Sequence, residues 1–107
     1  MVIYEVNLEV EAEIAEAFRL WLARHVLEML DLPGFISAEI AAVEADPNEA
    51  FKGRRWSVHY RLLDRQALAE YFEQHSARMR ADAQQRFADR FRASRRILSI
   101  ETLGAST

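Results

Sequence analysis

The sequence predicts an α+β fold in which one four-stranded antiparallel sheet carries its helices on a single face. Apolar and polar residues alternate along 2–10 and again along 54–62, which is the period of a half-buried strand. Segments 11–30 and 66–89 instead repeat apolar residues at spacings of three and four, the period of a helix packed on one side. With two further strands, the predicted order is β-α-β-β-α-β.

The first strand and the first helix are the clearest elements. The strand places Val2, Tyr4, Val6, Leu8 and Val10 on one face and Glu5, Asn7 and Glu9 on the other. A helix is expected over Glu11–Leu30, because acidic residues open it and Pro33-Gly34 ends it. Its apolar stripe comprises Ile14, Phe18, Trp21, Leu22, His25 and Met29.

The second strand is expected over Phe35–Glu44 and the third over Arg54–Leu62, with a polar loop between them. Along the third strand, Trp56, Val58, Tyr60 and Leu62 share one face, and Arg55, Ser57, His59 and Arg61 share the other. The first of these faces forms the floor of the core, and the second is left uncovered by the helices.

The helical tract after the third strand has to bend. As one straight helix, residues 64–91 would run about 42 Å, beyond the ~30 Å width of a small domain. Ser76 is the expected break, because its hydroxyl can cap a second helix. We therefore predict helices over Gln66–His75 and Ala77–Asp89, and a fourth strand over Ser94–Leu103. The apolar stripe of the tract comprises Leu68, Tyr71, Phe72, His75 and Met79.

This order is the split βαβ plan of ferredoxin-like folds. The chain of 107 residues fits one domain, expected over 1–103, with a short tail over 104–107. The absence of cysteine excludes a disulfide framework, a thiolate zinc site and a cysteine nucleophile. No apolar run approaches a membrane span, and the N-terminus lacks the features of a signal peptide, so we expect a cytoplasmic protein without membrane contact.

The net charge of −3 is unevenly distributed, since residues 1–50 carry −9 and residues 51–107 carry +6. The simplest interpretation is that the two halves face each other, within the fold or across a dimer. The alternative is an anion-binding patch built from Arg78, Arg80, Arg86, Arg90, Arg92, Arg95 and Arg96. No exposed aromatic residues alternate with these arginines, which argues against a nucleic-acid partner.

Five residues are candidates for a ligand pocket between the helices and the sheet: Trp21, His25, Tyr60, Tyr71 and His75. The two histidines lie in apolar stripes that face the same sheet, and a neutral imidazole there could shuttle a proton for a phenolic or enolic substrate. In the alternative interpretation, each histidine binds a backbone carbonyl and the aromatic rings only fill the core. Neither a paired-histidine spacing nor a carboxylate cluster indicates a metal site, and no cofactor is expected.

Four segments of the chain resemble a bacterial family known only as a domain of unknown function. They are MVIYEVNLEV, the segment from WLARH to LPGF, WSVHYRLLD, and the segment from HSARMR to QQRFADRFRASRRIL. The resemblance covers nearly the whole chain, and RFADRF is its most specific part. It implies a ferredoxin-like, dimeric α+β barrel and supplies no activity.

More distantly, the fold plan resembles the antibiotic-biosynthesis monooxygenase and haem-degrading group, whose members are homodimers with a pocket between helices and sheet. The haem-degrading members carry an Asn on the first strand, a Trp in the second helix and a haem-ligating His after it. Asn7 stands at the first position, but Tyr71 stands at the second and Ala81 at the third. The sequence therefore favours a non-catalytic homodimeric module that either binds a small hydrophobic or aromatic ligand or serves as an interaction module. The alternative is a cofactor-independent enzyme of the monooxygenase or isomerase kind.

Overall fold

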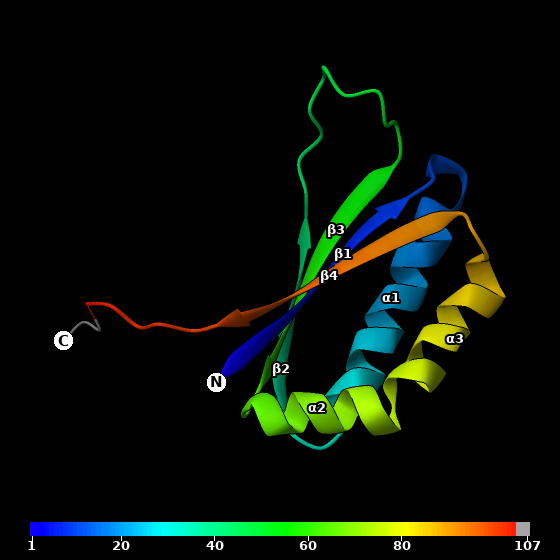
Figure 1. Ribbon diagram of the computed structural model, residues 1–107. Coiled ribbons are helices and arrows are strands. Elements are labelled where there is room, and N and C mark those ends of the chain that lie inside the picture. Colours follow the sequence, from blue (N-terminus) through cyan, green and yellow to red (C-terminus); the bar gives the residue numbers. More distant parts are fainter. Residues whose placement is uncertain (105–107) are drawn as a thin grey trace.

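The computed structural model describes residues 1–104, which form four strands, three α-helices and a short 3-10 helix. In chain order, these are β1 (Val2–Val10), η1 (Ala12–Ile14), α1 (Ala15–Leu30), β2 (Phe35–Ala42), β3 (Arg54–Leu62), α2 (Arg65–Gln74), α3 (Ser76–Phe87) and β4 (Phe91–Ser99). The strands form one antiparallel sheet in the order β2-β3-β1-β4. The predicted α+β, ferredoxin-like fold is confirmed (Figure 1).

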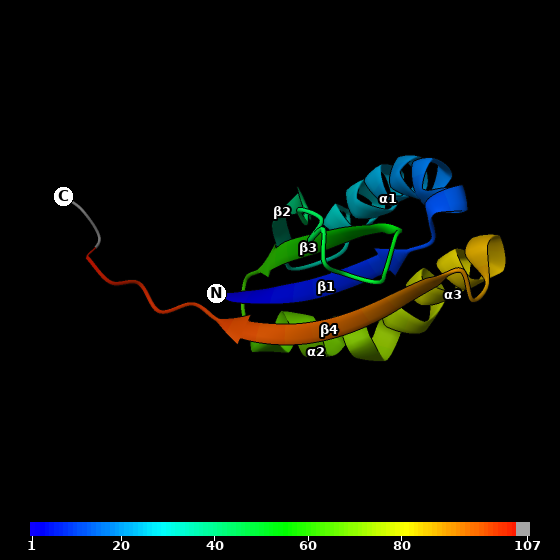
Figure 2. The ribbon, with the colours of Figure 1, turned by 90° about the horizontal axis from the view of Figure 1, so that it is seen from above.

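The three α-helices pack on one face of the sheet, with α1 on the side of β2 and with α2 and α3 on the side of β4 (Figure 2). Tyr4 of β1 is paired with Tyr60 of β3 on this inner face, and both side chains are buried. The next pair along, Glu5 and His59, points to the opposite face because side chains alternate along a strand. The predicted division of β1 and β3 into a core face and a polar face is confirmed.

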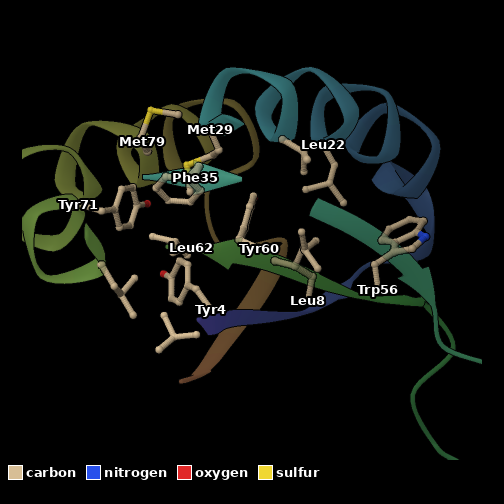
Figure 3. Packing of buried hydrophobic residues seen from close by; sticks show 14 of the residues in the cluster. Tyr4, Leu8, Leu22, Met29, Phe35, Trp56, Tyr60, Leu62, Tyr71 and Met79 are labelled. Carbon is tan, nitrogen blue, oxygen red and sulfur yellow. The ribbon is translucent and has the colours of Figure 1, made fainter. Parts of the chain in front are cut away.

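The core fills the space between the inner face of the sheet and the helices. In Figure 3, Leu22 and Met29 of α1 face Leu8 and Tyr60 of the sheet. Phe18 of α1 is fully buried, in a cluster of rings from α1, α3, β3 and β4. Full burial of a side chain of this size contributes roughly 1.5–3 kcal/mol to folding.

The first helix begins later than predicted and ends as predicted. Its first turn is the 3-10 helix η1, so the α-helix starts at Ala15 and not at Glu11. The amide of Glu11 is instead bonded to the carbonyl of Arg90, at 3.1 Å, which ties this turn to the segment before β4. After α1, Gly34 has a φ of 84°, and a Cβ there would lie 2.4 Å from the Cβ of Ala67. Glycine is therefore required at this turn.

The helical tract breaks one residue earlier than the predicted Ser76, at His75, so that α2 ends at Gln74 and α3 begins at Ser76. Asp64 caps α2 by accepting a hydrogen bond from the amide of Ala67 at 2.9 Å. Ser76 does not cap α3, because its hydroxyl donates to the carbonyl of Phe72 at 2.9 Å. The serine thus satisfies a carbonyl at the end of α2, while α3 starts without a side-chain cap.

The last helix ends earlier than predicted, and the last strand is shifted toward it. α3 ends at Phe87 and not at Asp89, because Ala88 adopts a positive φ of 50°. The turn that follows brings the chain to the sheet at Phe91 and not at Ser94.

The other strand ends also differ from the predicted ones. β4 ends at Ser99 and not at Leu103, and β2 ends at Ala42 and not at Glu44. Residues 100–104 leave the sheet in an extended arm (Figure 1). Beyond Gly104, the tail predicted over 104–107 lies outside the described residues.

The acidic first half and the basic second half of the chain meet across the sheet. Arg55 on β3 pairs with Glu9 on β1 at 2.9 Å, and Arg96 on β4 pairs with Glu5 on β1. The prediction that the two halves face each other within the fold is confirmed. Between Met1 and Gly104, no helix combines the length and the apolarity needed to cross a membrane.

Candidate functional site

A cavity of about 220 Å³ lies between the helices and the inner face of the sheet. Four of the five side chains predicted for a pocket line it: Trp21 and His25 from α1, Tyr60 from β3 and Tyr71 from α2. The structure thus brings together residues that are far apart in the sequence. His75 is not among the lining residues.

His75 lies at the break between α2 and α3, partly exposed to solvent. Its Nδ1 atom is 2.7 Å from Nη2 of Arg78, on the surface. The helical spacing that places His75 in line with Tyr71 does not extend to it, because α2 ends one residue earlier, at Gln74. The prediction that His75 approaches His25 and lines one pocket with it is therefore wrong.

His25 is held in place by an aromatic neighbour on its own helix. Its imidazole stacks on the indole of Trp21, and Trp21 Nε1 donates a hydrogen bond of 2.8 Å to the carboxylate of Asp82 on α3. Arg86 also donates to that carboxylate, at 3.0 Å. The hydrogen bond from Trp21 is the main reason why the pKa of Asp82 lies below its usual value. A chain of contacts between α1 and α3 therefore fixes the position of the imidazole.

The imidazole of His25 has an unused hydrogen-bonding atom. Its Nδ1 is buried and has no hydrogen-bond partner among the described residues. Burial lowers the pKa of His25 below 6.5, although the charges of Glu28 and Asp82 act in the opposite direction. The ring is therefore neutral near pH 7 and can donate or accept one hydrogen bond, depending on its tautomer. Leaving a buried polar atom unpaired costs about 1–3 kcal/mol.

Trp21 and His25 also border a shallow surface groove between α1 and α3. The same two rings line the inner cavity. They form the wall between the cavity and this groove.

Four polar residues outside the predicted set line the cavity: Tyr4, Arg80, Gln84 and Arg95. Tyr4 was predicted only as part of the core floor, and the two arginines only as part of an arginine patch. Arg95 pairs with Val6 in the sheet, so it lies on the face that the helices cover. A correct register for the last strand would have revealed this position.

On the opposite face of the sheet, none of the described helices covers Glu5, and the side chains around it bury its carboxylate. The carboxylate accepts hydrogen bonds from Arg96 and, at 2.9 Å, from Asn7, and His59 Nε2 lies 3.0 Å from it. Only 4% of Glu5 is exposed, although the sequence predicts an uncovered polar residue. The hydrogen bond from Arg96, followed by that from Asn7, lowers the pKa of Glu5 to about 2. This cluster fastens β4 and β3 to β1.

In the part of the chain that the structure describes, no three histidine or carboxylate side chains gather as a metal-ligand set. The side chains that line the cavity are the candidates for contact with an organic ligand. They supply aromatic faces, hydroxyl groups, an imidazole and guanidinium groups.

The family model described as "Domain of unknown function (DUF4286)" matches residues 1–101. The chain belongs to this family. The family resemblance drawn from RFADRF and the other segments is thereby confirmed. No curated protein matches this DUF4286 chain.

Solved structures share the fold of this DUF4286 chain at low sequence identity. SnoaB, a cofactor-independent oxygenase from Streptomyces nogalater, has a TM-score of 0.68 at 13% identity, with 98% of each chain covered. An ethyl tert-butyl ether D (EthD) family protein from Bacillus halodurans has a TM-score of 0.69 at 16% identity, covering 94% of this chain and 100% of its own.

A variant of MhuD, crystallised with two manganese protoporphyrin IX molecules per active site, shares the fold as well. It has a TM-score of 0.66 at 17% identity, covering 98% of this chain and 100% of its own. The distant resemblance to the monooxygenase and haem-degrading group thus holds for the fold.

Proposed function

We propose that this DUF4286 protein is a homodimeric module that binds a small hydrophobic or aromatic ligand between its helices and its sheet. The observation that carries the proposal is the cavity of about 220 Å³, whose walls combine aromatic rings with the imidazole of His25. An apolar cavity with a few convergent polar groups is the usual form of a small-molecule site.

The size of the cavity limits the ligand. Its volume of about 220 Å³ lies below the ~300–1,000 Å³ of pockets for drug-sized molecules. An engineered apolar cavity of roughly 150 Å³ binds benzene. The ligand is therefore a compact molecule built on one ring. The rings of Trp21, Tyr60 and Tyr71 offer it flat aromatic surfaces.

The dimer is supported by the surface that the helices leave uncovered. Ile3 of β1 pairs with Leu98 of β4 on the outer face of the sheet, and both are only partly buried. The arm after β4 adds Ile100 and Leu103, which are 37% and 90% exposed. A second copy packed on this face would remove these apolar side chains from water.

Thermal melts and titration calorimetry with one-ring aromatic compounds test whether the cavity binds a ligand. A ligand that binds only the native state raises the melting temperature by mass action. Ala83→Phe places a ring in the cavity, because Ala83 is 7% exposed and lines it. Ala81→Phe adds the same ring to the exposed side of α3 and is the matched control.

We expect binding to be lost in Ala83→Phe and kept in Ala81→Phe. Binding that survives Ala83→Phe at full strength would contradict the proposal. A complete lack of response by the wild-type protein to the panel would contradict it as well.

A second candidate function, a cofactor-independent enzyme, is favoured by the chemistry of His25. A neutral imidazole that lines the cavity can act as a general base toward a bound ligand. SnoaB shares the fold and is described as a cofactor-independent oxygenase. In deuterated buffer, such an enzyme would replace the acidic C–H hydrogen of a bound enolisable ligand with deuterium. Proton NMR would follow the loss of the signal of that hydrogen. His25→Gln should stop this exchange while binding persists, and a ligand that binds without any exchange would favour the non-catalytic module.

A further inference from the structure

Three tyrosines from three different elements meet at the cavity. Tyr4 of β1, Tyr60 of β3 and Tyr71 of α2 are 1%, 2% and 3% exposed, and all three line the cavity. The ring centroid of Tyr4 lies 5.9 Å from that of Tyr60 and 5.7 Å from that of Tyr71. Figure 3 shows Tyr71 entering the core from the helices, while Tyr4 and Tyr60 rise from the sheet.

The hydroxyl groups of these tyrosines are poorly satisfied by the protein. Nη2 of Arg80 donates to the hydroxyl of Tyr4 at 3.4 Å, which is beyond the usual distance of a hydrogen bond. The hydroxyls of Tyr60 and Tyr71 form no side-chain hydrogen bond among the described residues, and neither atom is completely enclosed, so both reach the space of the cavity. A buried tyrosine hydroxyl normally finds a partner.

The hydroxyls of Tyr60 and Tyr71 are donors at physiological pH. Burial raises the pKa of Tyr71 to about 12, although the charges of Arg80 and Arg95 act in the opposite direction. Burial also raises the pKa of Tyr60. Each phenol therefore keeps its proton and can give it in a hydrogen bond.

The charge around the cavity is positive. Arg80 of α3 and Arg95 of β4 line the cavity and are exposed, so they lie at its mouth. Neither forms a salt bridge with a described carboxylate, and no Asp or Glu is among the lining residues. Other arginines do pair with carboxylates: Arg55, Arg61, Arg86, Arg90 and Arg96. Hydrogen bonds from neutral and cationic donors in such a site favour an anion.

We propose that the ligand is a small planar organic acid whose oxyanion is bound by the hydroxyls of Tyr4, Tyr60 and Tyr71 together with Arg80 and Arg95. This inference rests on the proposed function, because it names the ligand class of the same cavity. The volume of about 220 Å³ accommodates one aromatic ring bearing one acidic group. The ring lies against the apolar walls, and the acidic group lies toward the mouth.

Calorimetric titration with benzoate and with benzamide tests the inference, because the two probes have the same ring and nearly the same size but differ in charge. Benzoate should bind wild-type protein at least about tenfold more tightly than benzamide, a difference of about 1.4 kcal/mol. Arg80→Gln and Tyr71→Phe should each weaken the binding of benzoate and leave the binding of benzamide nearly unchanged. Arg92→Gln is the matched control, because Arg92 is exposed on β4 as Arg95 is, but it lies on the outer face of the sheet and does not line the cavity.

The melting temperature of each variant without ligand shows whether it is folded, and Arg95→Gln provides a second arginine variant. Equal affinities for benzoate and benzamide would overturn the inference and leave the ligand-binding function standing, provided that Ala83→Phe abolishes both. A preference for benzoate that persists in both arginine variants would also overturn it. If neither probe binds and neutral one-ring compounds bind no better, the inference and the proposed function fail together.

Discussion

The imidazole of His25 lies stacked on the indole of Trp21, with ring centroids 4.6 Å apart and ring planes inclined by 22°. The indole is itself fixed by its hydrogen bond of 2.8 Å to Asp82. A carboxylate on α3 thus determines where a histidine of α1 stands at the edge of the cavity. The geometry of the candidate site depends on how these two helices are joined.

Replacing Asp82 with alanine should therefore loosen the contact between α1 and α3. The variant loses hydrogen bonds from Trp21 and Arg86 to a charged group, and the carboxylate is 40% exposed. We expect the free energy of unfolding to fall by about 1–2 kcal/mol, as measured by urea denaturation. Asp89→Ala, at an exposed position just after α3, is the control. Equal losses in the two variants would show that Asp82 does not join the helices.

Acid should weaken the fold through Glu5. Its pKa in the folded protein is about 2, below the usual value of 4.5. The stabilisation by Glu5 is therefore complete above pH 4.5 and is lost as the pH falls toward 2. Glu5→Gln should show a shallower loss of stability over this range in urea denaturation series. Arg96→Gln should raise the pKa of Glu5 toward its usual value and so make the acid-dependent loss of stability smaller. Identical pH profiles of the wild type and Glu5→Gln would contradict this assignment.

Two phenylalanines that the helical stripes predict to be equally buried should differ in their contribution. Phe18 is fully buried, with ring centroids of Phe87 and Phe91 at 4.9 and 5.1 Å, whereas Phe72 is only partly buried against Tyr4. Phe18→Ala should lower the free energy of unfolding by about 3–5 kcal/mol. Phe72→Ala should cost less, about 1–3 kcal/mol. A larger loss of unfolding free energy for Phe72→Ala than for Phe18→Ala would show that Phe18 does not lie at the centre of the core.

The proposed dimer can be tested on the uncovered face of the sheet. Leu98→Arg introduces a charge on that face, beside Ile3. Sedimentation velocity should show a dimer for the wild type and a shift toward monomer for this variant, because a buried unpaired charge opposes association. Leu27→Arg carries the same change on the exposed side of α1, where Leu27 is 64% exposed, and should remain dimeric. A monomeric wild type at high micromolar concentration would refute the dimer.

The sequence predicted the central strands well, because alternation over nine residues leaves little freedom in β1 and β3. The last strand was misplaced for a local reason. Ala88 adopts a positive φ, which alanine rarely does, so nothing in the sequence signals the sharp turn after α3. The apolar residues Ile100 and Leu103 suggested a strand that continues, but they belong to the exposed arm.

The candidate site was predictable only where helical periodicity holds without interruption. His25 lies within the regular helix α1 and reaches the cavity, but His75 follows the last residue of α2 and turns away from it. The burial of Glu5 depends on Arg96, a residue 91 positions later in the chain, and thus on the register of β4. Arg61 of β3 similarly pairs with Glu39 of the neighbouring strand β2 at 3.7 Å, a contact that depends on the register of these two strands.

The most direct test of the ligand-binding cavity is to locate a bound probe by NMR. Intermolecular NOEs should connect the ring protons of benzoate with the methyl protons of Met79, Ala83 and Ala93, all of which line the cavity. The methyl groups of Leu20 and Leu27, exposed on the outer side of α1, should give none. NOEs restricted to these leucines, with none to Met79, Ala83 or Ala93, would show that the probe binds on the surface and would contradict the account.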